Sequence, residues 1–146
     1  MWNRVSLIYL IVCSCVFSFL SMPPAGHEGK AQWMTLAISF SYPFFLAWTV
    51  PKNGFWRGAL QLLLILTVAL ICGFLTYLLW YAYLQYRRLG GEFHLFEALG
   101  WTFGESLAFY LYLDVVPTFL IASVNYPIGY LASFGLIRLV RRSSAR

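Results

Sequence analysis

The side chains that could perform acid–base or metal chemistry are few and scattered along the chain. There are five acidic residues and two histidines, and Asp114 is the sole aspartate. An aspartyl dyad is therefore excluded, and neither His27 nor His94 belongs to the H-E-x-x-H pattern of zinc hydrolases. His94 and Glu97 stand one helical turn apart and could bind a divalent ion with Glu92 or Glu28, but no second histidine clusters with them. The sequence therefore does not support a metal site.

The chain also lacks the glycine patterns that hold phosphates or nucleophiles. It contains no glycine-rich phosphate loop, and Gly104, Glu105 and Ser106 depart from the G-x-S-x-G pattern of hydrolases. No motif predicts a cofactor. We therefore expect a protein that is not an enzyme and that uses neither a cofactor nor a metal.

One polar stripe stands out in the apolar C-terminal third. Asp114 is the only charge in a run of thirty-two residues, 106–137. Tyr110, Asp114, Thr118 and Asn125 follow one another at spacings of four, four and seven, which places them on one face of a helix. A carboxylate inside a bilayer is costly, so such a stripe marks an ion or proton path or a contact between helices.

Two helix registers are open for this run, because about 20 helical residues already span a hydrocarbon core of roughly 30 Å. A span over 106–126 buries Asp114 well below the outer surface. A span over 117–140 begins at Pro117 and leaves Asp114 at the outer interface, near a helix N-terminus. The arginines after residue 137 should stay at the inner headgroups, and this favours the second register.

Composition indicates that membrane helices position these residues. The chain is 61% hydrophobic and 10% charged, against about 25% charged residues in soluble domains. We predict an all-α polytopic membrane protein forming a single domain, 1–146, with four transmembrane helices and a short amphipathic helix, 92–99, in the third loop. The predicted spans are residues 5–21, 32–50, 58–83 and 117–140, and the outer loop is 84–116.

The first predicted span has an alternative interpretation. Residues 5–21 follow Arg4 and are equally compatible with a cleaved signal peptide. The sequence after them lacks an A-x-A-like cleavage site, so we favour an uncleaved helix. Cys13, Cys15 and Cys72 all fall inside predicted spans, so no disulfide framework is expected.

The second span is interrupted by Pro43, which removes a backbone donor and predicts a kink. Ser39, Ser41 and Tyr42 lie in the turn before this proline. Their hydroxyls are expected to satisfy the carbonyls that the proline frees.

The third span is the clearest, since Trp56 and Trp80 stand twenty-four positions apart. That separation is about 36 Å along a helix, which matches one crossing between two interfacial belts. Small residues four apart allow another helix to approach closely. The candidate packing pairs are Ala69 with Gly73 and Gly129 with Ser133.

The basic residues predict how the chain crosses the membrane. With four spans and both termini in the cytoplasm, seven basic residues face inward and three outward, in accord with the positive-inside rule. We therefore expect a multi-pass protein of the inner (plasma) membrane. The inward set is Arg4, Lys52, Arg57, Arg138, Arg141, Arg142 and Arg146. They stand at the ends of apolar segments instead of forming a stripe, so no nucleic-acid partner is expected.

The leading functional hypothesis is binding to another membrane protein, as an accessory subunit, an assembly factor or an immunity-type protein. Such binding would use helix packing within the membrane and the acidic, aromatic outer loop. The acidic and histidine residues expected to contact a partner there are Glu92, His94, Glu97 and Glu105.

Two other hypotheses remain open. A homo-oligomeric ion or proton channel or transporter would use the stripe around Asp114, with conduction between copies, because four helices leave little room for an internal pore. A weaker possibility is a quinone or lipid site formed by tyrosine and tryptophan residues at the outer interface.

Overall fold

The structure, a computed structural model, describes residues 2–21, 30–49, 54–88, 100, 103–104, 107–108 and 110–144. It is all-helical, and no strand occurs among these residues, so the all-α prediction is confirmed. The predicted amphipathic helix, 92–99, lies outside the described residues. The helices are α1 (Arg4–Leu20), α2 (Lys30–Thr49), α3 (Phe55–Arg88) and α5 (Val116–Ser144), with a π-helical turn, η1 (Leu111–Val115), leading into α5.

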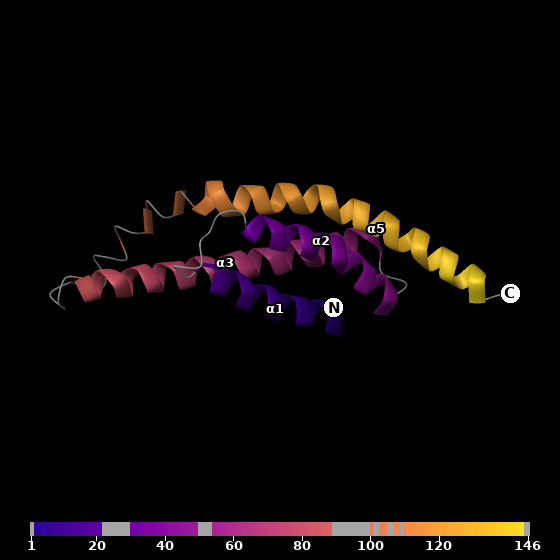
Figure 1. Ribbon diagram of the computed structural model, residues 1–146, viewed down its shortest axis with the longest axis horizontal. Coiled ribbons are helices and arrows are strands. Elements are labelled where there is room, and N and C mark those ends of the chain that lie inside the picture. Colours follow the sequence, from indigo (N-terminus) through magenta and orange to yellow (C-terminus); the bar gives the residue numbers. More distant parts are fainter. Residues whose placement is uncertain are drawn as a thin grey trace.

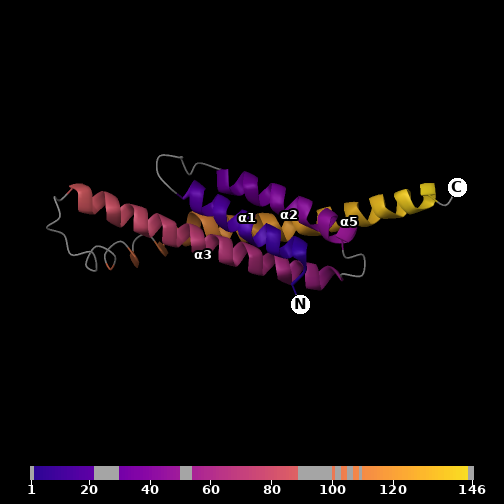
Figure 2. The same cartoon turned by 90° about the horizontal axis from the view of Figure 1, so that it is seen from below.

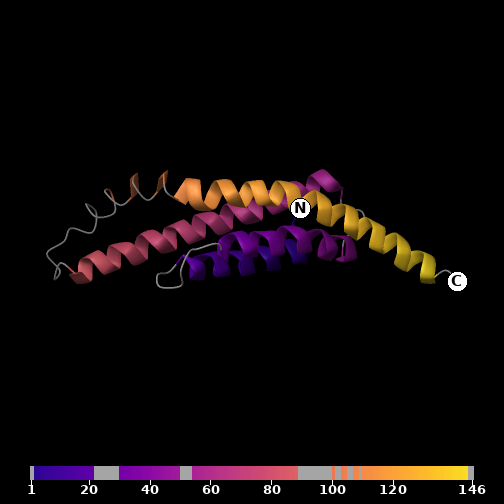
Figure 3. The ribbon, with the colours of Figure 1, turned by 45° about the horizontal axis from the view of Figure 1, so that its top comes forward.

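The helices alternate in direction along the chain. In Figure 1, α1 and α3 run one way while α2 and α5 run the other. The most extensive packing is between parallel helices: α1 lies along α3, and α2 lies along α5. Figures 2 and 3 show from two further sides that the four helices lie lengthwise beside one another, with α3 and α5 reaching past the others at opposite ends. The core is therefore assembled from two close pairs instead of four equivalent neighbours.

The ends of α1 are set by local hydrogen bonds. Asn3 caps the helix, because its Oδ1 accepts the Ser6 N–H at 2.7 Å and so satisfies one of the free donors of the first turn. At the other end the Ser21 N–H donates to the Phe17 carbonyl at 3.0 Å. These bonds fix the length of the segment that packs on α3.

Glycines permit the close approach within each pair. A Cβ on Gly129 would lie 2.6 Å from the Phe40 carbonyl oxygen, so the α5 and α2 backbones touch there. A Cβ on Gly73 would lie 2.9 Å from the Ser21 Oγ and the Tyr110 hydroxyl and 3.3 Å from the Phe17 carbonyl oxygen. Both contacts are of the small-residue kind found between membrane helices.

Two hydrogen bonds fix α5 lengthwise against α3. The Tyr126 hydroxyl donates to the Phe55 carbonyl at 3.0 Å, and the Tyr110 hydroxyl donates to the Leu70 carbonyl at 2.8 Å. Residues 110–126 therefore lie beside residues 55–73 of α3. All four helices share this length, which is about 27 Å at 1.5 Å per residue and close to the roughly 30 Å of a hydrocarbon core. We call it the shared length.

Beyond the shared length, α3 and α5 extend in opposite directions (Figure 1). At 1.5 Å per residue, residues 74–88 of α3 add about 22 Å at one end. At the other end, residues 131–144 of α5 add about 21 Å beyond Tyr130, whose ring packs on the Phe55 ring of α3. Of the two registers considered for the last span, the first, 106–126, includes the residues of α5 that lie beside the first half of α3.

The predicted spans 58–83 and 117–140 lie side by side over about 9 Å in this pairing. Which residues of each helix would lie in a bilayer stays a prediction. The arginine tail, from which the second register was chosen, contains no information about which part of α3 lies beside α5.

By length and apolar composition, two helical segments are able to cross a membrane: α3 and residues Leu111–Ile137. The helix α1 is apolar but has 17 residues. The helix α2 carries polar side chains at Gln32, Thr35 and Ser39 and does not belong to that class. The prediction that the chain forms helices long and apolar enough to cross a membrane is therefore confirmed for two of the four described helices.

Candidate functional site

The acidic residues expected to contact a partner, Glu92, His94, Glu97 and Glu105, lie outside the described residues. Among the residues that the structure does describe, no three His, Cys, Asp or Glu side chains gather in a way that could hold a metal ion. The arrangement has to be read from the polar groups and cavities of the helices themselves.

The predicted polar stripe does not line one continuous surface. Tyr110 is buried against α3 through its bond to the Leu70 carbonyl, and Thr118 is buried with its Oγ1 3.5 Å from the Thr35 Oγ1 of α2. The Asn125 amide turns back and donates to the Ile121 carbonyl of its own helix. Asp114 is half-buried in η1. The stripe is thus divided among three different environments.

The turn that carries Asp114 is built around Pro117. In η1 the Val116 N–H reaches back five residues to the Leu111 carbonyl, which makes the turn wider than an α-helical one. Pro117 has no N–H to donate to the Leu113 carbonyl four residues earlier. The Gln32 side chain of α2 supplies the missing donor, with its Nε2 3.1 Å from that oxygen.

A buried polar cluster, which we call the Tyr42 cluster, joins α1, α2 and α3. The Tyr42 hydroxyl lies 2.8 Å from the Ser6 Oγ and donates to the Gln61 Oε1 at 3.2 Å. The Ser6 Oγ also lies 2.9 Å from the Asn3 Oδ1. Ser6 and Tyr42 are fully buried. Tyr42 therefore bonds across helices, contrary to the expectation that it would satisfy a carbonyl beside Pro43.

The sequence did not single out this cluster, although a signal was present. Gln61 is the only amide within the predicted span 58–83, and a buried amide in a membrane helix needs partners. The Ser39 Oγ donates to the carbonyls of Thr35 and Leu36, which are not the carbonyl that Pro43 leaves without its donor, that of Ser39.

The predicted packing residues lie at the crossings within the helix pairs. Ala69 is fully buried, and Gly73 faces the end of α1. Gly129 faces the Phe40 backbone, while the buried Ser133 donates to the Tyr130 carbonyl of its own helix. Each candidate pair is thus buried within one of the two helix pairs.

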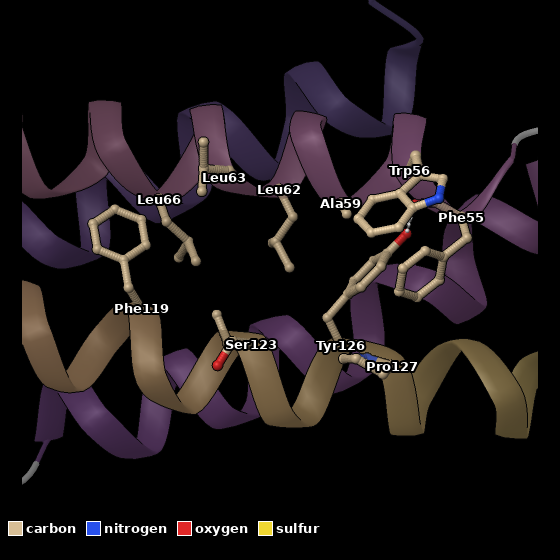
Figure 4. A pocket seen from close by; sticks show the side chains of 11 residues that line it. Phe55, Trp56, Ala59, Leu62, Leu63, Leu66, Phe119, Ser123, Tyr126 and Pro127 are labelled. Carbon is tan, nitrogen blue, oxygen red and sulfur yellow. Dashed lines mark hydrogen bonds between the residues drawn. The ribbon is translucent and has the colours of Figure 1, made fainter.

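A groove lies between α3 and α5, and we call it the α3–α5 groove. These two helices make few contacts with each other, and the space between them has a volume of about 520 Å³. Figure 4 shows side chains from both helices facing it. Its lining is almost wholly apolar. The lining residues are Phe55, Trp56, Ala59, Leu62, Leu63, Leu66, Phe119, Ala122, Ser123, Tyr126 and Pro127.

The two ends of the groove differ. At the Phe55 end, the Tyr126 ring packs on the Phe55 ring with centroids 5.3 Å apart, beside a Trp56 indole that is 82% exposed. At the other end, Phe119 reaches from α5 toward Leu66 (Figure 4). Between them the small side chains of Ala59, Ala122 and Ser123 leave the space unfilled. Such a groove can bind an apolar group but offers no acid, base or nucleophile.

No protein-family model, no curated protein and no solved structure matches this chain.

Proposed function

We propose that this protein is an integral membrane protein whose shared length fills the hydrocarbon core, and that it binds another membrane protein through the extensions of α3 and α5. The agreement between a shared length of about 27 Å and a hydrocarbon core of roughly 30 Å supports this placement. It puts the start of α3, with Arg57, at the inner surface and Asp114 inside the core.

The observation that carries the proposal is the apolar surface of the two extensions. In α3, Leu79 is 66% exposed and Tyr83 is 47% exposed. In α5, Leu131 is 72% exposed and Leu136 is 53% exposed. With the shared length in the core, Leu79, Tyr83 and Leu136 lie beyond the hydrocarbon, where lipid tails do not cover them, and Leu131 lies at its edge.

Exposed apolar surface of this kind marks an interaction site with protein. A partner that spans the same bilayer and packs on these extensions would bury them at both ends of the bundle. The protein would then act as an accessory or assembly subunit without chemistry of its own.

The test is capture of the partner from native membranes. We expect the wild-type chain, solubilised in mild detergent, to co-purify with a larger membrane protein, and Leu131→Gln to reduce the recovered partner at least fivefold. The matched control is Ala132→Gln, which changes the neighbouring exposed residue of the same helix. A monomer that alone restores the phenotype of a deletion strain would refute the proposal.

The placement in the bilayer is tested separately. In a chain whose native cysteines are replaced, single cysteines at 79 and 131 should react with an impermeant maleimide from opposite sides of the membrane. Reaction of both positions from one side would contradict the placement whatever the partner result.

A second candidate is an ion or proton path through Asp114 between copies of the chain. It is favoured by the position of Asp114 inside the shared length and on a π-helical turn, a feature that often accompanies functional sites. The test is flux through vesicles containing the purified protein. Flux that Asp114→Asn abolishes would support this path, and absence of flux in the wild type would end it.

A further inference from the structure

We propose that the α3–α5 groove holds one acyl chain of an anionic phospholipid from the inner leaflet, with the headgroup at the end of the bundle where α3 begins. This inference rests on the bilayer placement given above but not on the protein partner. It assigns a ligand class to a surface that the helix extensions do not use.

The length of the groove fits a lipid chain. Its lining on α3 runs from Phe55 to Leu66, which is about 16 Å of helix. A hydrocarbon core of roughly 30 Å has leaflets about half that thick. The groove therefore extends from the membrane surface to the middle of the bilayer, which is the depth occupied by one acyl chain.

The closed inner end favours a lipid over a helix. Phe119 and Leu66 meet across the space where the groove ends, near the bilayer midplane (Figure 4). A transmembrane helix of a partner would have to continue through this point to cross the membrane. An acyl chain ends there, so it can occupy the groove without displacing Phe119.

The lining chemistry also matches an acyl chain. The one hydroxyl that Ser123 brings to the groove donates to the Leu120 carbonyl of its own helix at 2.8 Å. The Tyr126 hydroxyl is likewise used, through its bond to the Phe55 carbonyl. An apolar occupant therefore leaves neither of these hydroxyls without a partner, and it buries apolar area that water would otherwise contact.

Charge selects the headgroup. Arg4 and Arg57 are exposed in the first turns of α1 and α3, at the end of the bundle where the groove begins, and Trp56 lines the groove itself. In the part of the chain that the structure describes, the acidic side chain is Asp114, toward the opposite end. Two guanidinium groups and an interfacial tryptophan suit a phosphate at headgroup depth, and they favour an anionic headgroup over a zwitterionic one.

The experiment is native mass spectrometry of the purified full chain, with and without added phosphatidylglycerol or phosphatidylcholine. We expect the wild type to retain one phospholipid and to prefer phosphatidylglycerol. Ser123→Phe, which places a ring in the groove, should reduce lipid retention about tenfold. Val124→Phe is the matched control, because Val124 is 61% exposed on the same helix but does not line the groove.

The outcomes separate the alternatives. Loss of the lipid in Ser123→Phe alone supports the inference. Equal retention in both variants, equal loss in both, or no bound lipid in the wild type even with added phosphatidylglycerol overturns it. A photo-crosslinking residue at position 63 that reacts with a protein instead of a lipid would also overturn it, in favour of a partner helix in the groove.

The preference for an anionic headgroup is tested by a separate variant. Arg57→Gln should reduce the preference for phosphatidylglycerol over phosphatidylcholine severalfold while one phospholipid is still retained. An unchanged preference would refute the role of Arg57. Because the mass-spectrometric measurements use the purified chain alone, their failure is distinguishable from a failure to find a protein partner.

Discussion

The two sides of α5 differ in how closely they pack on the neighbouring helix. Toward α2 the helix presents Gly129, whose backbone touches that of Phe40. Toward α3 it presents Phe119 and Ser123, and a space of about 520 Å³ separates the helices. One side has no room for a methyl group, while the other leaves a groove unfilled.

This contrast shows where the bundle obtains its cohesion. Between apolar helices in lipid there is no hydrophobic driving force, so association depends on close van der Waals contact and interhelical hydrogen bonds. The α2–α5 and α1–α3 pairs have such contacts. The α3–α5 side is connected mainly at its ends, by Tyr110 and Tyr126, and the space between these two contacts is open.

The largest expected effect comes from adding a methyl group to the tight side. Gly129→Ala puts a Cβ 2.6 Å from the Phe40 carbonyl oxygen, so the α2 and α5 backbones must move apart. We expect the free energy of unfolding to fall by about 1–3 kcal/mol, the range for overpacking. The measurement is SDS titration in mixed micelles followed by circular dichroism.

Gly135→Ala is the matched control for that substitution. It lies on the same helix with no atom within 4 Å of its added Cβ, and it should be neutral or slightly stabilising. Equal destabilisation by the two substitutions would show that the tight crossing does not hold the bundle together.

The next effect concerns the Tyr42 cluster, which connects the two helix pairs. Tyr42→Phe removes the hydroxyl that bonds Ser6 and Gln61 in a fully buried site, and we expect a loss of about 1 kcal/mol. Tyr112→Phe, at a tyrosine that is 76% exposed, should have no effect in the same titration. If both behave alike, the cluster does not couple the pairs.

A smaller effect is expected where α2 supports the π-helical turn. Gln32→Leu removes the donor to the Leu113 carbonyl, and because this bond is exposed the loss should be about 0.5 kcal/mol. Hydrogen exchange of the amides in η1 should speed up locally. Gln85→Leu, whose amide bonds only the Tyr81 hydroxyl on its own helix, should leave exchange at η1 unchanged.

The smallest effect should come from the largest added side chain. Ser123→Phe introduces a whole ring into the α3–α5 groove, and we expect unfolding to change by no more than about 0.5 kcal/mol. A phenyl group would then cost less than the single methyl of Gly129→Ala. A loss comparable to that of Gly129→Ala would mean that the groove is not open space.

The helices of this fold are predictable from local sequence, and their alignment is not. Long apolar runs and the tryptophans at positions 56 and 80 indicated helices close to those observed, because helix formation in lipid depends on local composition. The level of α5 against α3 depends instead on Tyr110 meeting Leu70 and Tyr126 meeting Phe55, which are 40 and 71 positions apart. No local pattern contains that pairing.

The candidate site divides in the same way. The spacing of Gly129 and Ser133 pointed to a close approach by another helix, since small residues four apart are a local signal. The α3–α5 groove was not foreseen, because a cavity is defined by what two distant segments leave empty. Ser6 and Gln61 were missed because a single polar residue in an apolar run looks unremarkable until its partner is known.

The wide turn η1 takes up one extra residue without turning the helix on either side of it. The N–H of Val116 bonds the carbonyl five residues back, so this turn holds about one residue more than an α-helical turn does. Tyr110 and Thr118 are eight residues apart, which a regular α-helix would separate by about 80°, and the extra residue brings them to within about 20° of each other. Deleting a single residue between 111 and 115 would therefore restore a regular α-helix and leave Tyr110 directed at the Leu70 carbonyl, so η1 is the place where the chain can lose a residue without disturbing its partners.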